Sequence, residues 1–524
     1  MVGKITTFFL TLLLASVSLF GLVDASNFLK GRMYFFTLCY IALAGLLWRI
    51  KYTRIIAFIL AILWAVNSSL SILIYQLYQG QLNYQLATTI LSTNVQESQD
   101  FIFAHWSILL IALSLLLGFM FITFRLSSLV SKRNLIVLSS IILLTVIYKF
   151  SESALKGRLS DPSFNMIEKV LPYTSLNNFA VLGRAYQELN LLNTVSNYKP
   201  IYQLDTDETN IDTYVIVVGE SVRRDHLSLY GYARDTTPYI DKQKSNLFIF
   251  GQAIAPAPMT SMSLASILTI KASDDSSPSL LNDNILNIAN KVGFETYWFS
   301  RQNSIGQFET AVTSIAKSAN HKEWLLSGYD DALLVKLDEA LKANGKKKLI
   351  VLHTNGSHLS ACHQYPAEDS YFVNGGSEYE NCYDNSILFM DKLLNNIFKR
   401  LENTSASVLY FSDHGQMKRI KRGEVDYFHG SINPTKESLD IPQFIWYSPI
   451  INSKDKKIGS YNIPYSAANN YYLIANWLGI NKNNGIEISS PLSADYQADD
   501  KIIIMDTQLN LFDYQQLPSD NNLH

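Results

Sequence analysis

Apolar residues follow two different patterns along the chain, one on each side of residue 150. Before that point, long apolar runs alternate with short polar segments, and almost no charge interrupts a run. A helix needs about 20 apolar residues to cross a bilayer, and five runs reach or approach that length. They cover residues 5–23, 33–48, 55–75, 105–124 and 135–150. The pattern predicts a transmembrane domain of five helices over residues 1–150; the first run resembles a signal peptide, but the four that follow favour an anchor.

Positive charges between the runs indicate which loops face the cytoplasm. The second and fourth loops carry Arg49, Lys51, Arg54, Arg125, Lys132 and Arg133. The long third loop, 76–104, has neither Lys nor Arg, although Lys30 and Arg32 in the first loop count slightly against the assignment. With five crossings, everything after residue 150 lies outside the cytoplasm. We therefore expect a multi-pass membrane protein whose second half lies outside the cytoplasm, which in a bacterial cell means an inner-membrane protein with a domain in the periplasm.

Two polar stretches belong to this membrane half. Asn67, Ser68 and Ser69 interrupt the third run, and we expect them to hydrogen-bond to neighbouring helices or to contact a lipid headgroup. Residues 151–210 read as a periplasmic linker. Within it, "SLNNFAVLGRAYQELNLL" has helical periodicity and fits either a helix on the membrane surface or a plain linker helix.

From about residue 211, short β-branched runs alternate with amphipathic helices. The runs at 213–221, 295–300, 348–358, 407–415 and 442–448 read as buried strands, and residues 385–402 read as a helix. Strands that alternate with helices imply a largely parallel sheet covered on both faces. Residues 211–524 are therefore predicted to form an α/β domain.

Composition narrows the possible functions. The 524 residues carry a formal net charge of −2, which argues against a general nucleic-acid binder. Of three cysteines, Cys39 lies in an apolar run and reads as a buried thiol. Cys362 and Cys382 lie in the polar half, where they either form one disulfide in an oxidising compartment or remain two thiols.

Three predicted strands end in residues that can carry chemistry: Gly-Glu-Ser, Gly-Ser-His and Ser-Asp-His-Gly. In α/β sheets, ligands bind beyond the carboxyl ends of the strands. Glu220, Asp413 and His414 can meet at that edge, and two carboxylates with an imidazole suit zinc or manganese better than calcium or magnesium. The alternative is that Asp413 is a turn residue and His414 caps a helix.

A nucleophile is expected in "APAPMTSMSLASILT", where Thr260 and Ser261 precede an apolar helix. A hydroxyl at a helix N-terminus is well placed to meet a phosphate, and a metal ion makes such a hydroxyl easier to deprotonate. Thr260 or Ser261 could instead simply cap the helix. Ser221, next to Glu220, is a rival nucleophile.

Together these motifs resemble those of a known family. "VVGESVRRDHLSLYGYARDTTP", "PMTSMSLASILT", "LHTNGSH", "SDHG" and "YFHG" occur in the order seen in membrane-bound phosphoethanolamine transferases. Those enzymes modify lipid A and other lipopolysaccharide, and belong to the alkaline phosphatase and sulfatase superfamily. The resemblance covers the whole chain, because five spans followed by a periplasmic domain are also that family's plan.

The resemblance implies a role for each motif residue. Thr260 matches the nucleophile, and Glu220, Asp413 and His414 match ligands of one tightly bound Zn²⁺, with the Thr260 oxygen as the fourth. His358 and His429 match histidines that hold the phosphoryl group or a second, looser metal ion. Weaker candidates for substrate contacts are Asn303, Ser304, Thr93 and Glu97.

The implied reaction has two steps. Thr260 takes phosphoethanolamine from phosphatidylethanolamine, and an acceptor on lipopolysaccharide, either a core sugar or lipid A, then takes it from Thr260. Both substrates are amphiphiles, so a membrane anchor fits this reaction.

The sequence departs from the family after Asp-His-Gly, where relatives often have acidic residues. Gln416 is followed here by Lys418, Arg419, Lys421 and Arg422. Loss of a carboxylate puts a second metal ion in doubt. The basic residues either bind an anionic acceptor or form a solvated loop. Relatives that modify lipid A commonly carry several disulfides in this domain, so the resemblance slightly favours a core-sugar or other glycan acceptor for a chain in which only Cys362 and Cys382 can pair.

Two other functions stay open. A phosphoglycerol transferase acting on a periplasmic glycan has nearly the same plan. A catalytically silent membrane sensor is disfavoured, because an inactive descendant has no reason to keep Glu220, Thr260, Asp413 and His414. A sulfatase is disfavoured as well, because Thr260 cannot become formylglycine.

Overall fold

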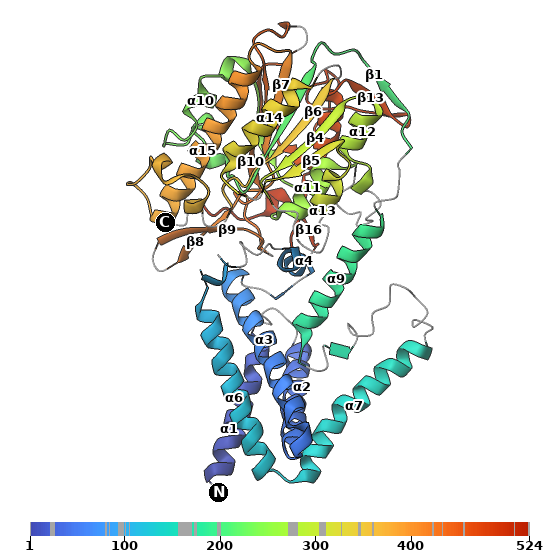
Figure 1. Ribbon diagram of the computed structural model, residues 1–524, viewed down its shortest axis with the longest axis vertical. Coiled ribbons are helices and arrows are strands. Elements are labelled where there is room, and N and C mark those ends of the chain that lie inside the picture. The colour runs from blue at the N-terminus through green and yellow to red at the C-terminus, as the bar shows by residue number, and fades with distance from the viewer. Residues whose placement is uncertain are drawn as a thin grey trace. The chain divides into compact units, whose positions relative to one another are not determined.

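The protein divides into two compact units, Met1–Leu189 and Asn190–His524. The structure, a computed structural model, is shown in Figure 1. It describes residues 2–20, 27–78, 81–82, 84–92, 99, 101–103, 105–155, 170–171, 175–195, 201–270, 281–302, 311–325, 327–343, 347–358, 361–421, 424–431, 433–453, 456–507 and 509–521. The sequence-based boundaries at 150 and 210 stay predictions.

The first unit is helical in the part that the structure describes. Its helices are α1 (Val2–Ser16), α2 (Asn27–Trp48), α3 (Arg54–Tyr78), α4 (Tyr84–Ser92), α6 (Ser107–Leu129), α7 (Lys132–Leu155) and α9 (Asn177–Val195), which continues past Leu189. Four described segments are long and apolar enough to cross a membrane: Phe28–Trp48, Lys51–Leu77, Ser107–Leu129 and Lys132–Leu155. The first predicted span corresponds to α1, whose 15 residues extend about 22 Å, less than the roughly 30 Å of a hydrocarbon core. The count of five crossings therefore stays a prediction.

Asn67 confirms that a polar residue within a span bonds to a neighbouring segment. Its side chain accepts a hydrogen bond from the Asn178 backbone N–H (3.0 Å) and donates to the Ser175 carbonyl (3.2 Å). In return, the Asn178 side chain donates to the Asn67 carbonyl and to Ser71 Oγ, both at 2.8 Å. The partner is thus the start of α9, the helix predicted within the linker.

The second unit is built on one mixed sheet, in the order β11-β3-β10-β7-β2-β6-β4-β5, with β12 paired to β3. Its strands are β2 (Thr213–Gly219), β3 (Leu247–Ile254), β4 (Glu295–Ser300), β5 (His321–Trp324), β6 (Lys348–His353), β7 (Ala406–Ser412), β10 (Asp440–Tyr447), β11 (Gly459–Tyr461) and β12 (Tyr465–Ser466). The strands β7, β2, β6, β4 and β5 run parallel, whereas β10 is antiparallel to both of its neighbours.

The five predicted strands are confirmed, and three of them end two to five residues earlier than expected. The early ends matter because the polar residues of 213–221, 348–358 and 407–415 lie just beyond the strands, where they can face a ligand. The strand β3 was not predicted. Its sequence "LFIFGQAI" follows a polar segment in which no amphipathic helix was predicted, so it lacks the alternation that marked the others.

Helices cover both faces of the sheet, as expected (Figure 1). All seven residues of β2 are buried, because alternate side chains enter opposite layers. Tyr214, Ile216 and Val218 enter one core, and Val215 and Val217 enter the other. Helices on the first face are α11 (Thr260–Leu268), α12 (Ile285–Lys291), α13 (Ala311–Ala316) and α16 (Asn470–Trp477); those on the second are α10 (Pro238–Asp241), α14 (Leu333–Lys342) and α15 (Glu378–Leu401).

Short strands form three further sheets. They are β1 (Leu204–Thr206) with β13 (Ile480–Asn483) and β14 (Ile486–Glu487), β8 (Met417–Lys421) with β9 (Glu424–Phe428), and β15 (Ile503–Met505) with β16 (Leu511–Asp513). The β8–β9 pair carries the basic residues that were expected either to bind an anionic acceptor or to form a solvated loop, and the choice between these two roles stays open. The segment pairs as an antiparallel hairpin in which Ile420 faces Val425 and Arg419 faces Asp426.

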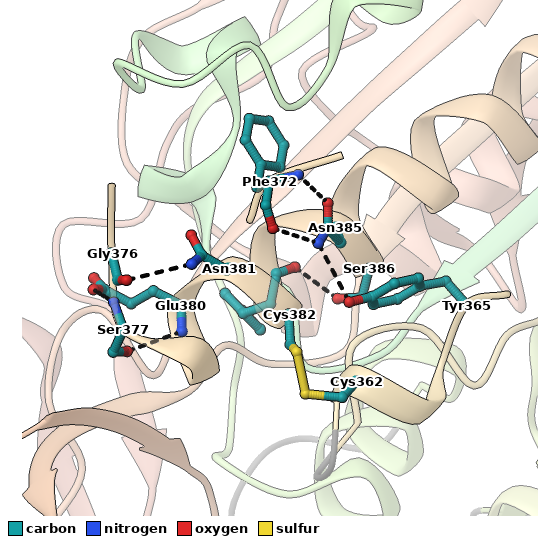
Figure 2. The surroundings of a disulfide bond; sticks show 11 residues. Cys362, Tyr365, Phe372, Gly376, Ser377, Glu380, Asn381, Cys382, Asn385 and Ser386 are labelled. Atoms are coloured by element: carbon teal, nitrogen blue, oxygen red, sulfur yellow. Dashed lines mark hydrogen bonds between the residues drawn. A yellow bond between two sulfur atoms is a disulfide. The ribbon is translucent and has the colours of Figure 1, made fainter. Parts of the chain in front are cut away.

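Cys362 and Cys382 form a disulfide, which resolves the open alternative. Figure 2 shows that it joins the first turns of α15 to the segment after His358. Close by, Asn385 accepts a hydrogen bond from the Phe372 N–H (2.7 Å) and donates to the Phe372 carbonyl (2.9 Å). The start of α15 thus holds the connection between β6 and α15 by a covalent bond and by hydrogen bonds.

Candidate metal centre

Neighbouring strands bring the candidate metal ligands together. Glu220 follows β2, and Asp413 and His414 follow β7; the two strands pair in parallel, with Gly219 opposite Ser412. Residues that follow paired ends of parallel strands must lie at the same edge of the sheet. The strand ends alone therefore place the two carboxylates and the imidazole side by side.

The three side chains form a compact, fully buried cluster. One ligand atom from each of Glu220, Asp413 and His414 lies within 4.8 Å of the others. His414 Nε2 is 3.4 Å from Asp413 Oδ2 and 3.6 Å from Glu220 Oε1. The relative exposure of all three residues is 0%.

Asp413 is held through one oxygen, and its other oxygen faces the cluster. Oδ1 accepts hydrogen bonds from the backbone N–H groups of Ser221 (2.9 Å) and His414 (2.7 Å). Among the described residues, Oδ2 has no hydrogen-bond partner although it is buried. A buried oxygen without a donor is costly, and a cation would satisfy it.

The His414 ring is held in one orientation. Nδ1 lies 2.7 Å from the Gly415 carbonyl, which can only accept a hydrogen bond, so Nδ1 carries the proton. Nε2 then has a free lone pair directed at the cluster. This is the arrangement of an imidazole metal ligand, whose second nitrogen donates to a carbonyl.

Charge repulsion and burial shape the titration of these groups. Burial and the charge of Glu220 raise the pKa of Asp413 well above its usual range. Burial alone would raise the pKa of Glu220 too, but the neighbouring histidines, His414 foremost, lower it. Burial lowers the pKa of His414, although the charge of Glu220 opposes this shift, and the lowered pKa favours the neutral imidazole. Glu220 therefore offers a carboxylate and His414 an imidazole, and Asp413 is a carboxyl group whose ionisation is unfavourable without a cation. This is a donor set that fits zinc.

Thr260 is the hydroxyl that meets this cluster. It is the first residue of α11, and its Oγ1 donates to Glu220 Oε2 (2.9 Å) and lies 3.3 Å from His414 Nε2. Ser263, one turn later, donates from Oγ to the Asp413 carbonyl (2.5 Å) and so attaches α11 to the ligand segment. Thr260, expected from the sequence as nucleophile or as cap, is not the N-cap residue of α11, which is Met259.

Two further histidines border the cluster. The ring of His429, just after β9, lies 4.9 Å from that of His414 and 5.4 Å from that of His358. Among the described residues, His429 Nδ1 is buried without a hydrogen-bond partner, and burial lowers the pKa of this histidine far below its usual value. A hydrogen bond from the Gly430 N–H to the Pro258 carbonyl (3.1 Å) connects this segment to the approach to Thr260.

Gly356 permits a close approach to the backbone of Glu220. A Cβ at this position would lie 2.8 Å from both the backbone N and O of Glu220, and the glycine has φ of +52°. Any side chain would push Glu220 from its place. The Gly-Ser-His motif thus carries a backbone requirement as well as His358.

The remaining predicted residues were Asn303, Ser304, Thr93 and Glu97, and all four lie outside the described residues. Two hydrogen bonds to Glu220 were not foreseen from the sequence. Ser221, considered as a rival nucleophile, is fully buried and donates from Oγ to Glu220 Oε1 (2.6 Å). Gln302 donates to Glu220 Oε2 (2.7 Å); the only signal for it was its place beside Asn303.

The hairpin β8–β9, which we call the basic hairpin, contains Lys418 and Arg419, whose described contacts differ in kind. Arg419 pairs with Asp426 (2.9 Å) and lies over the Phe428 ring. The Lys418 backbone N–H donates to Asp520 (2.7 Å), which connects the hairpin to the C-terminal segment. The side chain of Lys421 and all of Arg422 lie outside the described residues.

Known proteins resemble both halves of the chain. Residues 212–480 match the sulfatase family, and residues 3–196 match the transferase YhbX N-terminal domain. YhbX of Escherichia coli (strain K12), whose name gives only the general class of transferase, is 40% identical over 349 residues, 66% of this chain and 62% of YhbX. Phosphoethanolamine transferase OpgE of the same organism is 33% identical over 338 residues, 62% of this chain and 60% of OpgE. The chain thus matches about three fifths of the length of these relatives.

Solved structures share the fold. The integral membrane protein lipooligosaccharide phosphoethanolamine transferase A of Neisseria meningitidis has a TM-score of 0.62 at 19% identity, covering 89% of this chain and 95% of that one. The C-terminal periplasmic domain of EptC from Escherichia coli, solved in complex with Zn, has a TM-score of 0.53 at 24% identity, covering 62% of this chain and 99% of that domain. The chain belongs to the sulfatase family, and its relatives include proteins named phosphoethanolamine transferases.

Proposed function

We propose that this protein is a zinc-dependent phosphoethanolamine transferase of the bacterial inner membrane. It moves phosphoethanolamine from phosphatidylethanolamine to lipopolysaccharide, on a core sugar or on lipid A, through a covalent intermediate on Thr260. The observation that carries the proposal is the direction of the Thr260 hydroxyl, which donates to Glu220 while lying 3.3 Å from His414 Nε2. A hydroxyl that served only as a helix cap would bond to the backbone of α11 instead.

The first step transfers the group to Thr260. Its Oγ1 attacks the phosphorus of the donor, the bond from phosphorus to the diacylglycerol oxygen breaks, and diacylglycerol leaves with a proton. Glu220 Oε2 already accepts the hydrogen bond of the attacking hydroxyl, so the proton that Thr260 loses has an acceptor in place. A zinc ion held by Glu220, Asp413 and His414 would lower the pKa of that hydroxyl and offset charge on the phosphoryl oxygens.

The second step returns Thr260 to its starting state. A hydroxyl or phosphate oxygen of the acceptor attacks the same phosphorus, the bond to Thr260 Oγ1 breaks, and the threonine regains a proton. His358 and His429 border the cluster beside Thr260, where they can donate to the phosphoryl oxygens in both steps. Asn303 and Ser304 are proposed as further contacts, and Thr93 and Glu97 as contacts to the donor lipid.

The acceptor is proposed to meet the basic hairpin. Lys418 and Arg419 lie on the segment that directly follows the metal ligands, and His429 follows the same hairpin. Phosphorylated sugars of lipopolysaccharide are anionic and would be attracted there. We further propose five membrane crossings, with α1 as the first, which place the second unit in the periplasm.

Intact-mass analysis of the purified full-length protein tests the proposal. Incubated with phosphatidylethanolamine vesicles and zinc, the protein should gain one phosphoethanolamine on Thr260, and the Thr260→Ala variant should gain none. Peptide mapping places the adduct. A glycerol phosphate adduct formed from phosphatidylglycerol instead would establish the phosphoglycerol transferase. No adduct from either lipid, with zinc bound, would contradict the covalent mechanism.

A further inference from the structure

Gln302 donates a hydrogen bond to the metal cluster but has no part in the two steps proposed above. It lies two residues after β4, and its Nε2 donates to Glu220 Oε2 (2.7 Å) and to the Thr354 carbonyl (3.0 Å). Both partners are acceptors without a hydrogen of their own. The amide NH₂ group must therefore face them, and the orientation of the Gln302 side chain is fixed.

Hydrogen bonds hold both the Gln302 backbone and Thr354, the residue whose carbonyl Gln302 contacts. The Ser300 hydroxyl donates to the Gln302 carbonyl (2.8 Å) and accepts from the Gln302 N–H (3.1 Å). The Thr354 backbone N–H and hydroxyl both donate to the Val218 carbonyl, at 3.0 and 2.9 Å. Gln302 thus connects the ends of β4, β6 and β2 at the point where β2 delivers Glu220.

The donors on Glu220 are divided between its two oxygens. Oε1 accepts from Ser221 Oγ, whereas Oε2 accepts from Thr260 Oγ1 and from Gln302 Nε2. Once a phosphoryl group occupies Thr260 Oγ1, that oxygen has no hydrogen to donate. Gln302 is then the described side chain that still donates to Oε2 of a fully buried carboxylate.

We propose that Gln302 is a positioning residue for Glu220. Its amide holds Glu220 Oε2 in the orientation that a metal ion requires, and keeps this oxygen hydrogen-bonded while Thr260 carries the transferred group. Donors that orient a ligating carboxylate commonly change metal affinity about 10- to 100-fold when they are removed. This inference rests on the proposed metal site and adds a residue to it.

Metal binding to the full-length protein in detergent tests the inference. Gln302→Met keeps the length of the side chain without its donor, and Gln302→Asn keeps a donor that is one methylene too short. Gln252→Ala is the matched control, because Gln252 is exposed and its side chain donates to the Asn462 carbonyl instead of to a candidate ligand. Competition with a chromophoric chelator gives the Kd for zinc. The absorption spectrum of the cobalt-loaded protein reports the geometry of the ligands.

We expect the zinc Kd to rise about tenfold or more in Gln302→Met, with a changed cobalt spectrum, and to stay unchanged in Gln252→Ala. Gln302→Asn should behave like Gln302→Met, and it serves in its place if the methionine variant does not fold. In single turnover, the amount of phosphoethanolamine bound to Thr260 over time should also differ between these variants and the wild type.

Glu220→Ala separates the two ways in which the reasoning could fail. If Glu220→Ala loses zinc while Gln302→Met and Gln302→Asn keep the wild-type Kd and cobalt spectrum, the positioning role is wrong and the metal site stands. If Glu220→Ala also binds zinc like the wild type, the proposed metal site itself is wrong.

Discussion

Replacing Asp413 by Asn should stabilise the metal-free protein while weakening its hold on zinc. The carboxylates of Glu220 and Asp413 lie within 4.8 Å of each other in a fully buried site. At an effective dielectric constant of about 20, two unit charges at that distance repel by about 3 kcal/mol. The amide introduced by Asp413→Asn would keep an oxygen for the N–H groups of Ser221 and His414, and its NH₂ group would face Glu220 as a donor.

The sign of the pH dependence follows from the raised pKa of Asp413. An acid whose pKa is higher in the folded than in the unfolded protein binds more protons when folded. The metal-free wild type should therefore lose stability as the pH rises from about 4, the unfolded value, through the raised folded value. The Asn variant lacks this group, so its advantage should be small near pH 4 and should grow toward neutral pH.

Thermal unfolding of the full-length protein with and without a chelator measures both effects. With the chelator at a pH of about 7.5, we expect Asp413→Asn to unfold a few degrees above the wild type, since about 1–2 °C accompany each kcal/mol in a unit the size of Asn190–His524. Zinc at about 100 times its Kd should stabilise the wild type by about 2.7 kcal/mol, and the variant much less.

Asp330→Asn is the matched control. Asp330 is also buried with a raised pKa, of about 6, but both of its oxygens accept backbone hydrogen bonds, from Asn355 and Gly356 (both 2.8 Å). An amide there would face an N–H group, so this variant should be destabilised. If metal-free Asp413→Asn loses as much stability as Asp330→Asn, or if zinc stabilises it as strongly as the wild type, the account of the paired carboxylates is wrong.

Three further outcomes are expected. Thr260→Ser should retain partial formation of the intermediate, because its hydroxyl occupies the same place, whereas Thr260→Val should form none; equal adduct in both by intact mass would remove Thr260 from the reaction. Neutralising the basic hairpin should slow transfer to an anionic acceptor and leave the Thr260 intermediate intact, while Lys242→Gln, as control, changes neither; equal loss of both half-reactions in single turnover would refute an acceptor role. Replacing Cys362 and Cys382 by serine should cost up to about 3 kcal/mol, from the entropy of a 20-residue loop, as seen by thermal unfolding with and without reductant. A reductant that shifts the variant as much as the wild type would exclude this bond as the cause.

The sequence was enough to predict the candidate metal ligands, but not the hydrogen bonds that orient them. Glu220, Asp413 and His414 could be placed together because each follows a β-branched run, and parallel strands end at one edge. Gln302 and Ser221 could not be recognised, because their roles depend on which oxygen of Glu220 they face. The hairpin at 417–428 was missed for another reason: its lysines and arginines alternate with few apolar residues, so the charge pattern concealed the strand pattern.

Three positions that violate ordinary local rules lie at or beside the candidate metal centre, although others lie elsewhere in the described residues. Ser221 has φ of +62°, although it is not glycine. It lies between the candidate metal ligand Glu220 and the buried Arg223. Asp413 Oδ2 and His429 Nδ1 are buried without hydrogen-bond partners among the described residues. Each feature costs about 1–3 kcal/mol, and a chain selected for stability alone would remove them. Asp413 Oδ2 lies 3.4 Å from His414 Nε2, and the His429 ring lies 4.9 Å from the His414 ring. A cation bound at the cluster and a phosphoryl group beside it would satisfy such groups, so the cost would be borne only when the site is without its ligands.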